Sequence, residues 1–407
     1  MSRTGTIIPE TGEEFRQSES LPIATRLWAA GVIAILLTMC GSLGYLGAAD
    51  GARGIPVGIF RVKPSLTISS QYDDNVFKSR QKVGEKILNI QPVVQFSTHW
   101  KKLAFQAGVS SSIVRYESRS TEDFEDHNVS MDVKYSANRH LDLGLKSEVS
   151  FNHESRGAPD VGQIGAQDKP RRWKHYGIDG SAQYTQNRFR TQLELSHQID
   201  EKQEVGNYWN KAALTLMFAM APRTSLATGL GWKGIVYDNP ALRRDSQEKT
   251  VNVGVNWTGT AKTQGDLRVG YALKEPENSA AENSSAMTFG GSVSWKPLAR
   301  TSLNLNANRA FAEGGLVADY YVTTMAGVGL SHKLRSFLTF KSNLDHTTND
   351  YSSGLENEIW KGGVGLEYAF PRWLTMSSNF GRTSQKSNQP NSEYDSNEVM
   401  ISLTGGL

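Results

Sequence analysis

The chain has 407 residues, enough for two or three soluble domains, but its composition argues against compact apolar cores. Hydrophobic residues make up only 38% of the sequence, and glycine occurs 38 times. The formal net charge is +3, from 44 basic and 41 acidic residues, so no overall field attracts nucleic acid. The single cysteine, Cys40, lies near the amino terminus. The rest of the chain therefore has no thiol for a disulfide or for Cys-ligated metal.

The amino terminus has the pattern of a signal peptide. Arg26 precedes an apolar run over residues 27–39, which is shorter than the roughly 20 residues of a spanning helix. Small residues follow, and Gly47 with Ala49 satisfies the small-x-small rule for cleavage before Asp50. We predict a signal peptide with a long n-region over residues 1–49, a short periplasmic segment over residues 50–59, and the structural domain over residues 60–407.

After Pro56 the sequence alternates apolar and polar residues with a period of two, the pattern of β-strands. Leu193 and Leu195 share one face of a predicted strand, for example, while Glu194 lies on the other. The same alternation recurs over residues 141–154, 251–257 and 266–274. It predicts an all-β fold, either a soluble sandwich or a transmembrane antiparallel up-and-down barrel with one face toward lipid and one toward water.

Short turns with a basic residue separate pairs of predicted strands. Each interval between successive turns accommodates one hairpin with strands of membrane-spanning length. The count gives about eighteen strands, the first near residues 60–72 and the last near residues 394–404, so both ends lie on the periplasmic side. The predicted periplasmic basic turns contain Lys101, Arg139, Arg188, Arg223, Lys262, Arg300, Arg335 and Arg372.

The connections on the other side are longer and polar, as expected of extracellular loops, and this asymmetry favours the barrel over the sandwich. Aromatic residues near both sets of connections predict two interfacial girdles; Tyr116, Trp209 and Tyr237 belong to the set near the long loops. The polar residues that alternate with apolar ones along each strand are predicted to line the pore. These candidates are Asp142, Lys146, Glu148, Arg190, Glu194, Asp266, Arg268 and Lys274.

The longest loop, Arg156 to Arg172, is expected to fold over or into the pore and restrict it, because a barrel of this size would otherwise leak small solutes. Its glycines permit inward bending, and Lys169, Arg171 and Arg172 offer charge to Asp142, Glu148 and Glu154. The alternative is a mobile surface loop without a gating role.

The first predicted strand of the domain ends in the sequence Tyr72, Asp73, Asp74, Asn75, Val76 and Phe77. This motif resembles the opening strand of the putative beta-barrel porin 2 family, which includes EpsL-like barrels encoded beside capsule or exopolysaccharide genes. The resemblance implies a pore for export of an exopolysaccharide or capsular polysaccharide, working with a periplasmic export protein. The polar lumen suits small solutes equally well, so a general or substrate-specific diffusion porin is the alternative.

Other motifs favour structural roles. Clustered oxygens at residues 73–75 are interpreted as a turn rather than a Ca²⁺ site, since no binding-loop pattern follows. No His pair has metal-ligand spacing, and Ser, His and Asp are too scattered to define a triad, so we expect no metal, cofactor or catalytic residue; an outer-membrane enzyme is the third alternative.

The basic turns either contact lipid headgroups or dock a partner, with headgroups favoured. Expected partners are outer-membrane lipid, a polysaccharide and the barrel assembly machinery.

Overall fold

The computed structural model describes residues 54–161, 169–258, 262–277, 282–371, 373–390 and 392–407. The predicted signal peptide and its cleavage site lie outside these residues. The described strands are β1 (Ile55–Val57), β2 (Phe60–Asp73), β3 (Glu85–His99), β4 (Leu103–Tyr116), β5 (Phe124–Ser136), β6 (Leu141–His153), β7 (Arg172–Gln186), β8 (Phe189–Glu201), β9 (Asn207–Ala221), β10 (Thr224–Tyr237), β11 (Ser246–Trp257), β12 (Thr263–Pro276), β13 (Ser284–Leu298), β14 (Thr301–Glu313), β15 (Tyr320–Lys333), β16 (Leu338–Tyr351), β17 (Glu356–Ala369), β18 (Leu374–Ser387) and β19 (Tyr394–Gly406).

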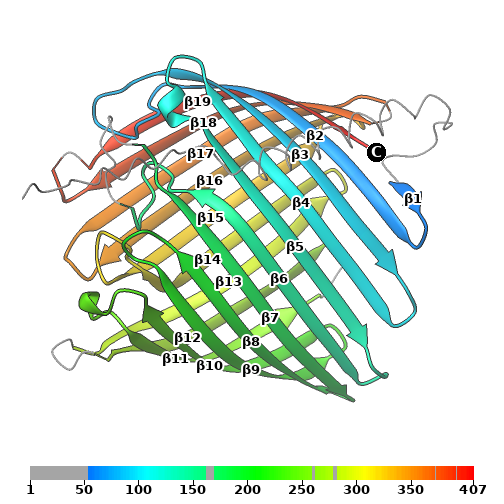
Figure 1. Ribbon diagram of the computed structural model, residues 1–407. Helices are drawn as coiled ribbons and strands as arrows, with labels where there is room; N and C mark the ends of the chain where they lie inside the picture. The colour runs from blue at the N-terminus through cyan, green and yellow to red at the C-terminus, as the bar shows by residue number, and fades with distance from the viewer. Residues whose placement is uncertain (1–53, 162–168, 259–261, 278–281, 372, 391) are drawn as a thin grey trace, which may run out of the picture. The chain divides into compact units, whose positions relative to one another are not determined.

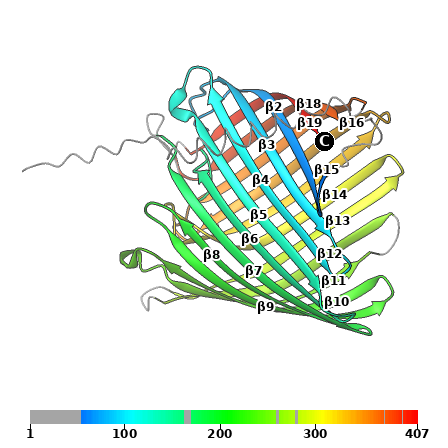
Figure 2. The same ribbon diagram turned by 45° about the vertical axis from the view of Figure 1, so that its right-hand side comes forward.

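Strands β2 to β19 form a closed antiparallel barrel in which each strand pairs with its neighbours in sequence (Figures 1 and 2). The sheet closes where β19 pairs with β2, with a register that runs from Glu398 opposite Asp73 to Gly406 opposite Ser65. Among the described residues this gives eighteen barrel strands, as the sequence predicts. The remaining strand, β1, forms a short hairpin with the start of β2. Closure leaves the barrel with no free edge.

The connections differ strongly between the two ends of the barrel. At one end seven of the eight predicted basic residues lie in turns such as residues 187–188 and 299–300, while Arg372 lies outside the described residues. At the other end the connections include residues 74–84 and the long connection between β6 and β7. The chain starts β2 and ends β19 at the short-turn end, where the Leu407 backbone N–H donates to the Pro64 carbonyl over 3.1 Å. The short-turn end is therefore the periplasmic one.

Alternation assigns the two faces of the wall. In β8, Leu193 and Leu195 are exposed on the outer face, and in β12 Leu267 and Val269 are exposed in the same way. A band of exposed apolar side chains around a closed barrel is the surface that contacts lipid. Only two short 3₁₀ helices, Ser120–Glu122 and Pro240–Leu242, occur in the described part of the chain, and no helix there is long and apolar enough to cross a bilayer.

Pro64 of β2 and Pro92 of β3 lie inside strands without breaking the wall. The pairing of β3 with β4 is interrupted between Ile90 and Val93, and Pro92 occupies the gap. Pro64 precedes the first β2 residue that pairs with β19. Because proline has no N–H to donate, both residues are tolerated where one neighbouring strand is not paired.

Candidate functional site

The predicted pore-lining residues lie on the face opposite the exposed apolar residues. In β6 they alternate with Leu143 and Leu145, in β8 with Leu193 and Leu195, and in β12 with Leu267 and Val269. Each of these strands thus places its predicted polar residues on one face of the wall. The residues so placed are Asp142, Lys146, Glu148, Arg190, Glu194, Asp266, Arg268 and Lys274.

Several of these side chains form contacts along the same face. The Ser136 hydroxyl donates to Asp142 over 2.7 Å, Asn128 donates to Glu148, and Ser292 donates to Asp266 over 2.8 Å. Lys146 lies 4.0 Å from the Asp132 carboxylate. Lys274 is buried and forms a 2.7 Å ion pair with Glu313. Side chains of the wall thus hydrogen-bond Asp142 and Glu148, and the expected contact of the long loop with these two carboxylates stays a prediction.

Charge on the inner face is unevenly distributed around the barrel. Strands β5 to β8 carry seven carboxylates and only three cations, Lys134, Lys146 and Arg190. The inner faces of β13 and β14 carry hydroxyl and amide groups instead, among them Ser292, Asn304 and Asn306. We call these two surfaces the acidic arc and the neutral arc. The carboxylates of the acidic arc are Asp126, Asp132, Asp142, Glu148, Asp179, Glu194 and Asp200.

The start of the long loop, residues 154–161, makes contacts with distant strands. The Tyr351 hydroxyl at the end of β16 donates to the Pro159 carbonyl over 2.8 Å. The backbone N–H of Leu316, between β14 and β15, donates to the Asp160 carbonyl over 2.9 Å. Because β6 and β16 are eight strands apart in the order of the eighteen-stranded sheet, this segment reaches the opposite wall. We call residues 154–161 the bridge; they confirm that the loop folds across the barrel.

The near end of the bridge is held by a buried ion pair. Arg156 Nε and Glu122 Oε2 are 2.7 Å apart, and the second guanidinium nitrogen, NH2, lies 2.7 Å from Oε1. The two side chains are only 6% and 4% exposed. The Arg156 guanidinium also stacks over the Phe77 ring at 4.6 Å from its centroid. A two-pronged ion pair of this kind fixes both the position and the orientation of the arginine.

The far end of the bridge is held by charge as well. Lys202, between β8 and β9, donates to the Asp160 carboxylate over 2.6 Å. After the bridge, Arg171 pairs with Glu154 over 2.8 Å and with Glu204 over 3.0 Å. Of the predicted loop contacts, the pairing of Arg171 with Glu154 is confirmed. Sequence reasoning missed Glu122, Lys202 and Tyr351, since nothing in a single sequence links residues that are 34, 42 and 192 positions from their partners.

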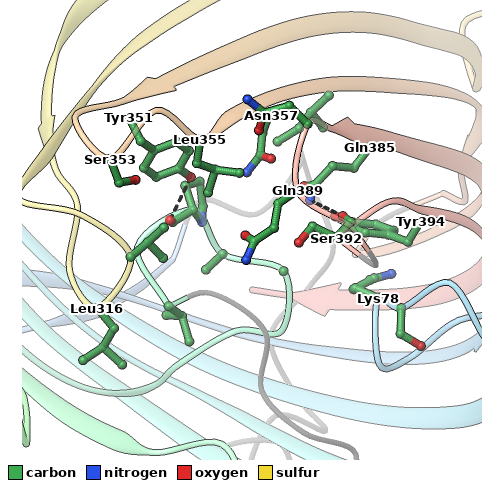
Figure 3. Close-up of a pocket in the computed structure, with 18 of the residues that line it drawn as sticks. Lys78, Leu316, Tyr351, Ser353, Leu355, Asn357, Gln385, Gln389, Ser392 and Tyr394 are labelled. Atoms are coloured by element: carbon green, nitrogen blue, oxygen red, sulfur yellow. Dashed lines mark hydrogen bonds between the residues drawn. The ribbon is translucent and has the colours of Figure 1, made fainter.

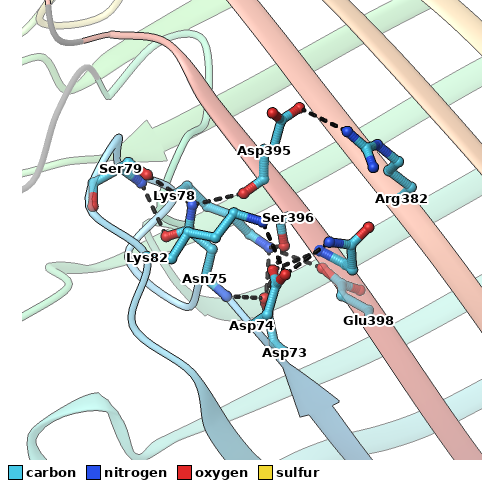
Figure 4. A network of polar contacts seen from close by, with 11 residues as sticks. Asp73, Asp74, Asn75, Lys78, Ser79, Lys82, Arg382, Asp395, Ser396 and Glu398 are labelled. Carbon is cyan, nitrogen blue, oxygen red and sulfur yellow. Dashed lines mark hydrogen bonds and ion pairs between the residues drawn. The ribbon is translucent and has the colours of Figure 1, made fainter.

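The family-like motif, residues 72–77, lies where the barrel closes (Figure 4). The Asp73 carboxylate accepts hydrogen bonds from the Asn75 backbone and the Ser396 hydroxyl, each over 2.8 Å. Fully buried Asn75 donates to the Asp395 carbonyl over 2.8 Å. These contacts tie β2 to β19, so we call residues 73–78 with residues 395–398 the clasp. The interpretation of residues 73–75 as a turn is confirmed by the Asp73 to Asn75 bond.

Lys78 is the charged loop residue at the centre of the clasp. Lys78 Nζ lies 2.8 Å from each of Asp73, Ser396 and Glu398. Its backbone has a left-handed φ of 49°, which is unfavourable for lysine and indicates that these side-chain contacts offset the strain. Burial disfavours the charged form of Lys78, yet the hydrogen bonds from its ammonium to Asp73 and Glu398 raise its pKa. The net shift favours a cation that is fully paired.

Asp74 faces the last strand from the other side of the turn. Its carboxylate accepts 2.7 Å hydrogen bonds from both the backbone and the side chain of Asn397, and a 2.9 Å bond from Lys82. Desolvation opposes ionisation, but these hydrogen bonds outweigh it and lower the pKa of Asp74 to about 2. Asp74 therefore stabilises the closure as an anion at neutral pH.

The expected outer girdle is partly wrong. Tyr237 is buried and donates to Glu313, on the face opposite exposed Leu230 and Trp232. Trp209 packs beside Tyr237, and Tyr116 packs with Val76 and Val114 in a second cluster. These rings face inward because they occupy the positions of β4, β9 and β10 that alternate with the outward-facing residues, such as Leu230 and Trp232 in β10. In the described part of the chain, no three His, Cys, Asp or Glu side chains form a group that could hold a metal ion.

Solved structures of proteins from Pseudomonas aeruginosa have a similar fold. OccK2 (OpdF) of Pseudomonas aeruginosa has a TM-score of 0.50 and 13% identity, and the match covers 85% of this chain and 98% of OccK2. OpdK of the same organism, solved with vanillate, has a TM-score of 0.48 and 13% identity, with coverage of 85% and 99%. OpdQ of P. aeruginosa has a TM-score of 0.48 and 9% identity, with coverage of 86% and 100%. At these identities the likeness shows the fold alone.

The sequence itself matches the family described as putative beta-barrel porin 2 over residues 49–205 and 231–406. The comparison with curated proteins gave no match. A closed barrel with an outward apolar band is the fold of the Gram-negative outer membrane, and it places lipid against the wall. With a match over most of its length and the barrel that this match implies, the chain belongs to the putative beta-barrel porin 2 family of outer-membrane porins.

Proposed function

We propose that the protein is a diffusion channel for small hydrophilic solutes, with a lumen narrowed by the bridge. The observation that carries this proposal is the anchoring of residues 154–161 to opposite walls through Glu122, Lys202 and Tyr351. An eighteen-stranded barrel is wide enough for an aqueous lumen, and a folded segment across it divides the opening. Such a channel selects solutes first by size.

The charge on the wall sets a second level of selection. The eight predicted polar residues of β6, β8 and β12 are proposed to line the pore, and the acidic arc gives part of this lining a negative field. A field of this sign raises the local concentration of cations and lowers that of anions. We therefore propose a preference for cationic and uncharged solutes over anionic ones.

Export of an exopolysaccharide or capsular polysaccharide is the second candidate. The neutral arc favours it, because rows of hydroxyl and amide groups offer many weak hydrogen bonds to a sliding polyol chain. A polymer would, however, have to pass beside an anchored bridge or displace it. For this reason the small-solute channel is the better supported of the two functions.

Deletion of Ala158 to Gln167 tests the proposal. In planar bilayers the deletion should raise single-channel conductance, and in proteoliposomes it should admit sugars larger than those that the wild type admits. Unchanged conductance and unchanged size limits in a correctly assembled deletion mutant would contradict the channel with a bridge. Loss of surface polysaccharide on gene deletion, together with wild-type liposomes impermeable to small sugars, would instead favour export.

We also propose that the signal peptide is cleaved and that the basic turns contact lipid. The mature protein should begin near Asp50 and migrate faster on unheated gels than after boiling, since a closed barrel resists unfolding in detergent. The periplasmic basic turns are proposed to contact inner-leaflet headgroups, at about 1 kcal/mol per residue near an anionic surface. Amino-terminal sequencing that finds residues of the predicted leader on the outer-membrane protein would contradict the cleavage.

A further inference from the structure

A cavity of about 800 Å³ lies at the extracellular mouth, between the bridge and the loops that follow β14, β16 and β18 (Figure 3). Its floor includes Pro159 and Val161 of the bridge. Its sides include Tyr351 of β16, Asn357 of β17 and Gln389 of the loop after β18. The volume falls within the range of small-molecule binding sites.

The described part of the lining has almost no free charge. Lys78 is the one lysine or arginine among the described lining residues, and Asp73, Ser396 and Glu398 already surround its ammonium at 2.8 Å. The described lining contains no carboxylate. An ion entering the cavity would lose hydration without gaining an unoccupied partner of opposite charge. The cavity therefore suits an uncharged ligand.

Polar groups for such a ligand are present. The Asn357 Oδ1 atom is buried and has no hydrogen-bond partner in the described part of the chain. In Figure 3 the Gln389 amide extends toward the middle of the cavity. A buried acceptor without a partner is costly, and a rotation of the Asn357 side chain toward the cavity would let a ligand hydroxyl satisfy it.

Apolar and aromatic surfaces lie beside these amides. Phe77, Leu316 and Ile359 contribute apolar surface, and Tyr351 and Tyr394 contribute rings with a polar end. A sugar has the complementary character, because its hydroxyls form hydrogen bonds at the rim of the ring while its C–H groups pack against apolar and aromatic faces.

We propose that this cavity is a binding site for a short uncharged saccharide at the extracellular mouth. The inference rests on the proposed channel function and names a solute class for it. Binding beside the bridge would hold the sugar next to the segment that crosses the barrel. The site thus combines recognition with the size limit that the bridge imposes.

The test uses the full mature protein in planar bilayers, with maltotriose as the uncharged probe. Wild-type channels should open in KCl alone, and maltotriose added on the loop side should cause transient blocks of the current. Gln389→Ala with Asn357→Ala should weaken the blocking affinity about tenfold, because the ligand loses two hydrogen-bonding groups. Gln389→Met, which keeps the length of the side chain, should weaken it in the same direction.

The control is Gln183→Ala, which removes the same chemical group from the inner face of β7, outside the cavity. It should leave the blocks unchanged. Equal blocking in the double variant and the wild type would overturn the site, as would stronger blocking by glucuronate or glucosamine than by maltotriose. Failure of the proposed channel function has a different signature, since no KCl conductance would then be seen in any variant.

Discussion

The two ends of the barrel use the chain in different ways. At the periplasmic end, turns such as residues 187–188 and 222–223 do little more than reverse the strand direction. At the extracellular end, the loops contribute to two apolar clusters, a buried ion pair and the clasp. The difference teaches that the wall and the mouth are stabilised separately. Alternation between lipid and water specifies the wall, whereas contacts between distant loops specify the mouth.

The largest effect should come from the anchor of the bridge. Arg156→Ala leaves the Glu122 carboxylate buried without its partner, a change that costs about 3 to 5 kcal/mol for a buried pair. The bridge should detach, so that single-channel conductance and protease sensitivity both increase while the barrel stays assembled. Arg300→Ala, at a periplasmic turn, should change neither quantity. Similar effects of the two substitutions would mean that the two ends do not differ as proposed.

In the wall that joins the two ends, the effect of a substitution should depend only on whether the side chain lies on the outer or the inner face. Leu195→Arg places a charge on the exposed apolar face and should cost about 2 to 4 kcal/mol near the middle of the membrane. Its yield of assembled, heat-modifiable protein should fall. Glu194→Arg changes the neighbouring residue on the inner face and should assemble normally but shift the reversal potential toward anions. Equal assembly defects would show that the assignment of the faces is wrong.

A matched pair of asparagines compares the two ends directly. Asn75 is fully buried in the clasp, and its amide bonds to Ser79 and Asp395. Exposed Asn138 caps a periplasmic turn by accepting from the N–H groups of His140 and Leu141. Asn75→Ala should destabilise the barrel by about 1 to 3 kcal/mol, because buried partners are left unsatisfied. Asn138→Ala should cost less in the same urea-unfolding assay, and the reverse order would contradict the special role of the clasp.

Acid should weaken the clasp by protonating Asp74. The folded pKa of Asp74 is depressed from 3.8 to about 2, so its stabilising contribution is present above pH 3.8 and is lost as the pH falls toward 2. The free energy of unfolding should therefore decrease as the pH is lowered from about 5 to about 2, the range that contains the unfolded and folded pKa values of Asp74. Asp74→Asn should be less stable at neutral pH and should show a smaller drop. A drop of equal size in this variant would assign the effect to other groups.

The smallest effect should come from the far contact of the bridge. Tyr351→Phe removes one hydrogen bond to the Pro159 carbonyl, worth about 0.5 to 1.5 kcal/mol. Because Lys202 still holds Asp160, the mean conductance should stay close to that of the wild type while open-channel current noise increases. A conductance as high as that of Arg156→Ala would show that Tyr351, not the ion pair, is the principal anchor.

Much of the wall could be predicted from the sequence, and little of the mouth. Leu193, Glu194 and Leu195 alternate because each must face lipid or water, so local sequence contains the information. The inward direction of Tyr237 follows the alternation of β10, but its packing partner Leu316 could not be predicted, because it comes from a loop distant in sequence. The inward fold of the long loop was predicted from its length, its glycines and its charged residues. Its partner Tyr351 lies 192 residues from Pro159 and carries no recognisable signal.

The clasp joins residues that are more than three hundred positions apart, such as Asp73 and Ser396. Until Tyr394 to Glu398 has been delivered to the growing sheet, Asp73, Asn75 and Lys78 lack their partners and β2 is an open edge. Closure thus acts as a checkpoint on the last strand: a chain cut before Tyr394 would leave buried polar groups unsatisfied and an edge exposed to lipid. The same few residues that recur as a family-like motif would in this way distinguish a finished barrel from an unfinished one during assembly.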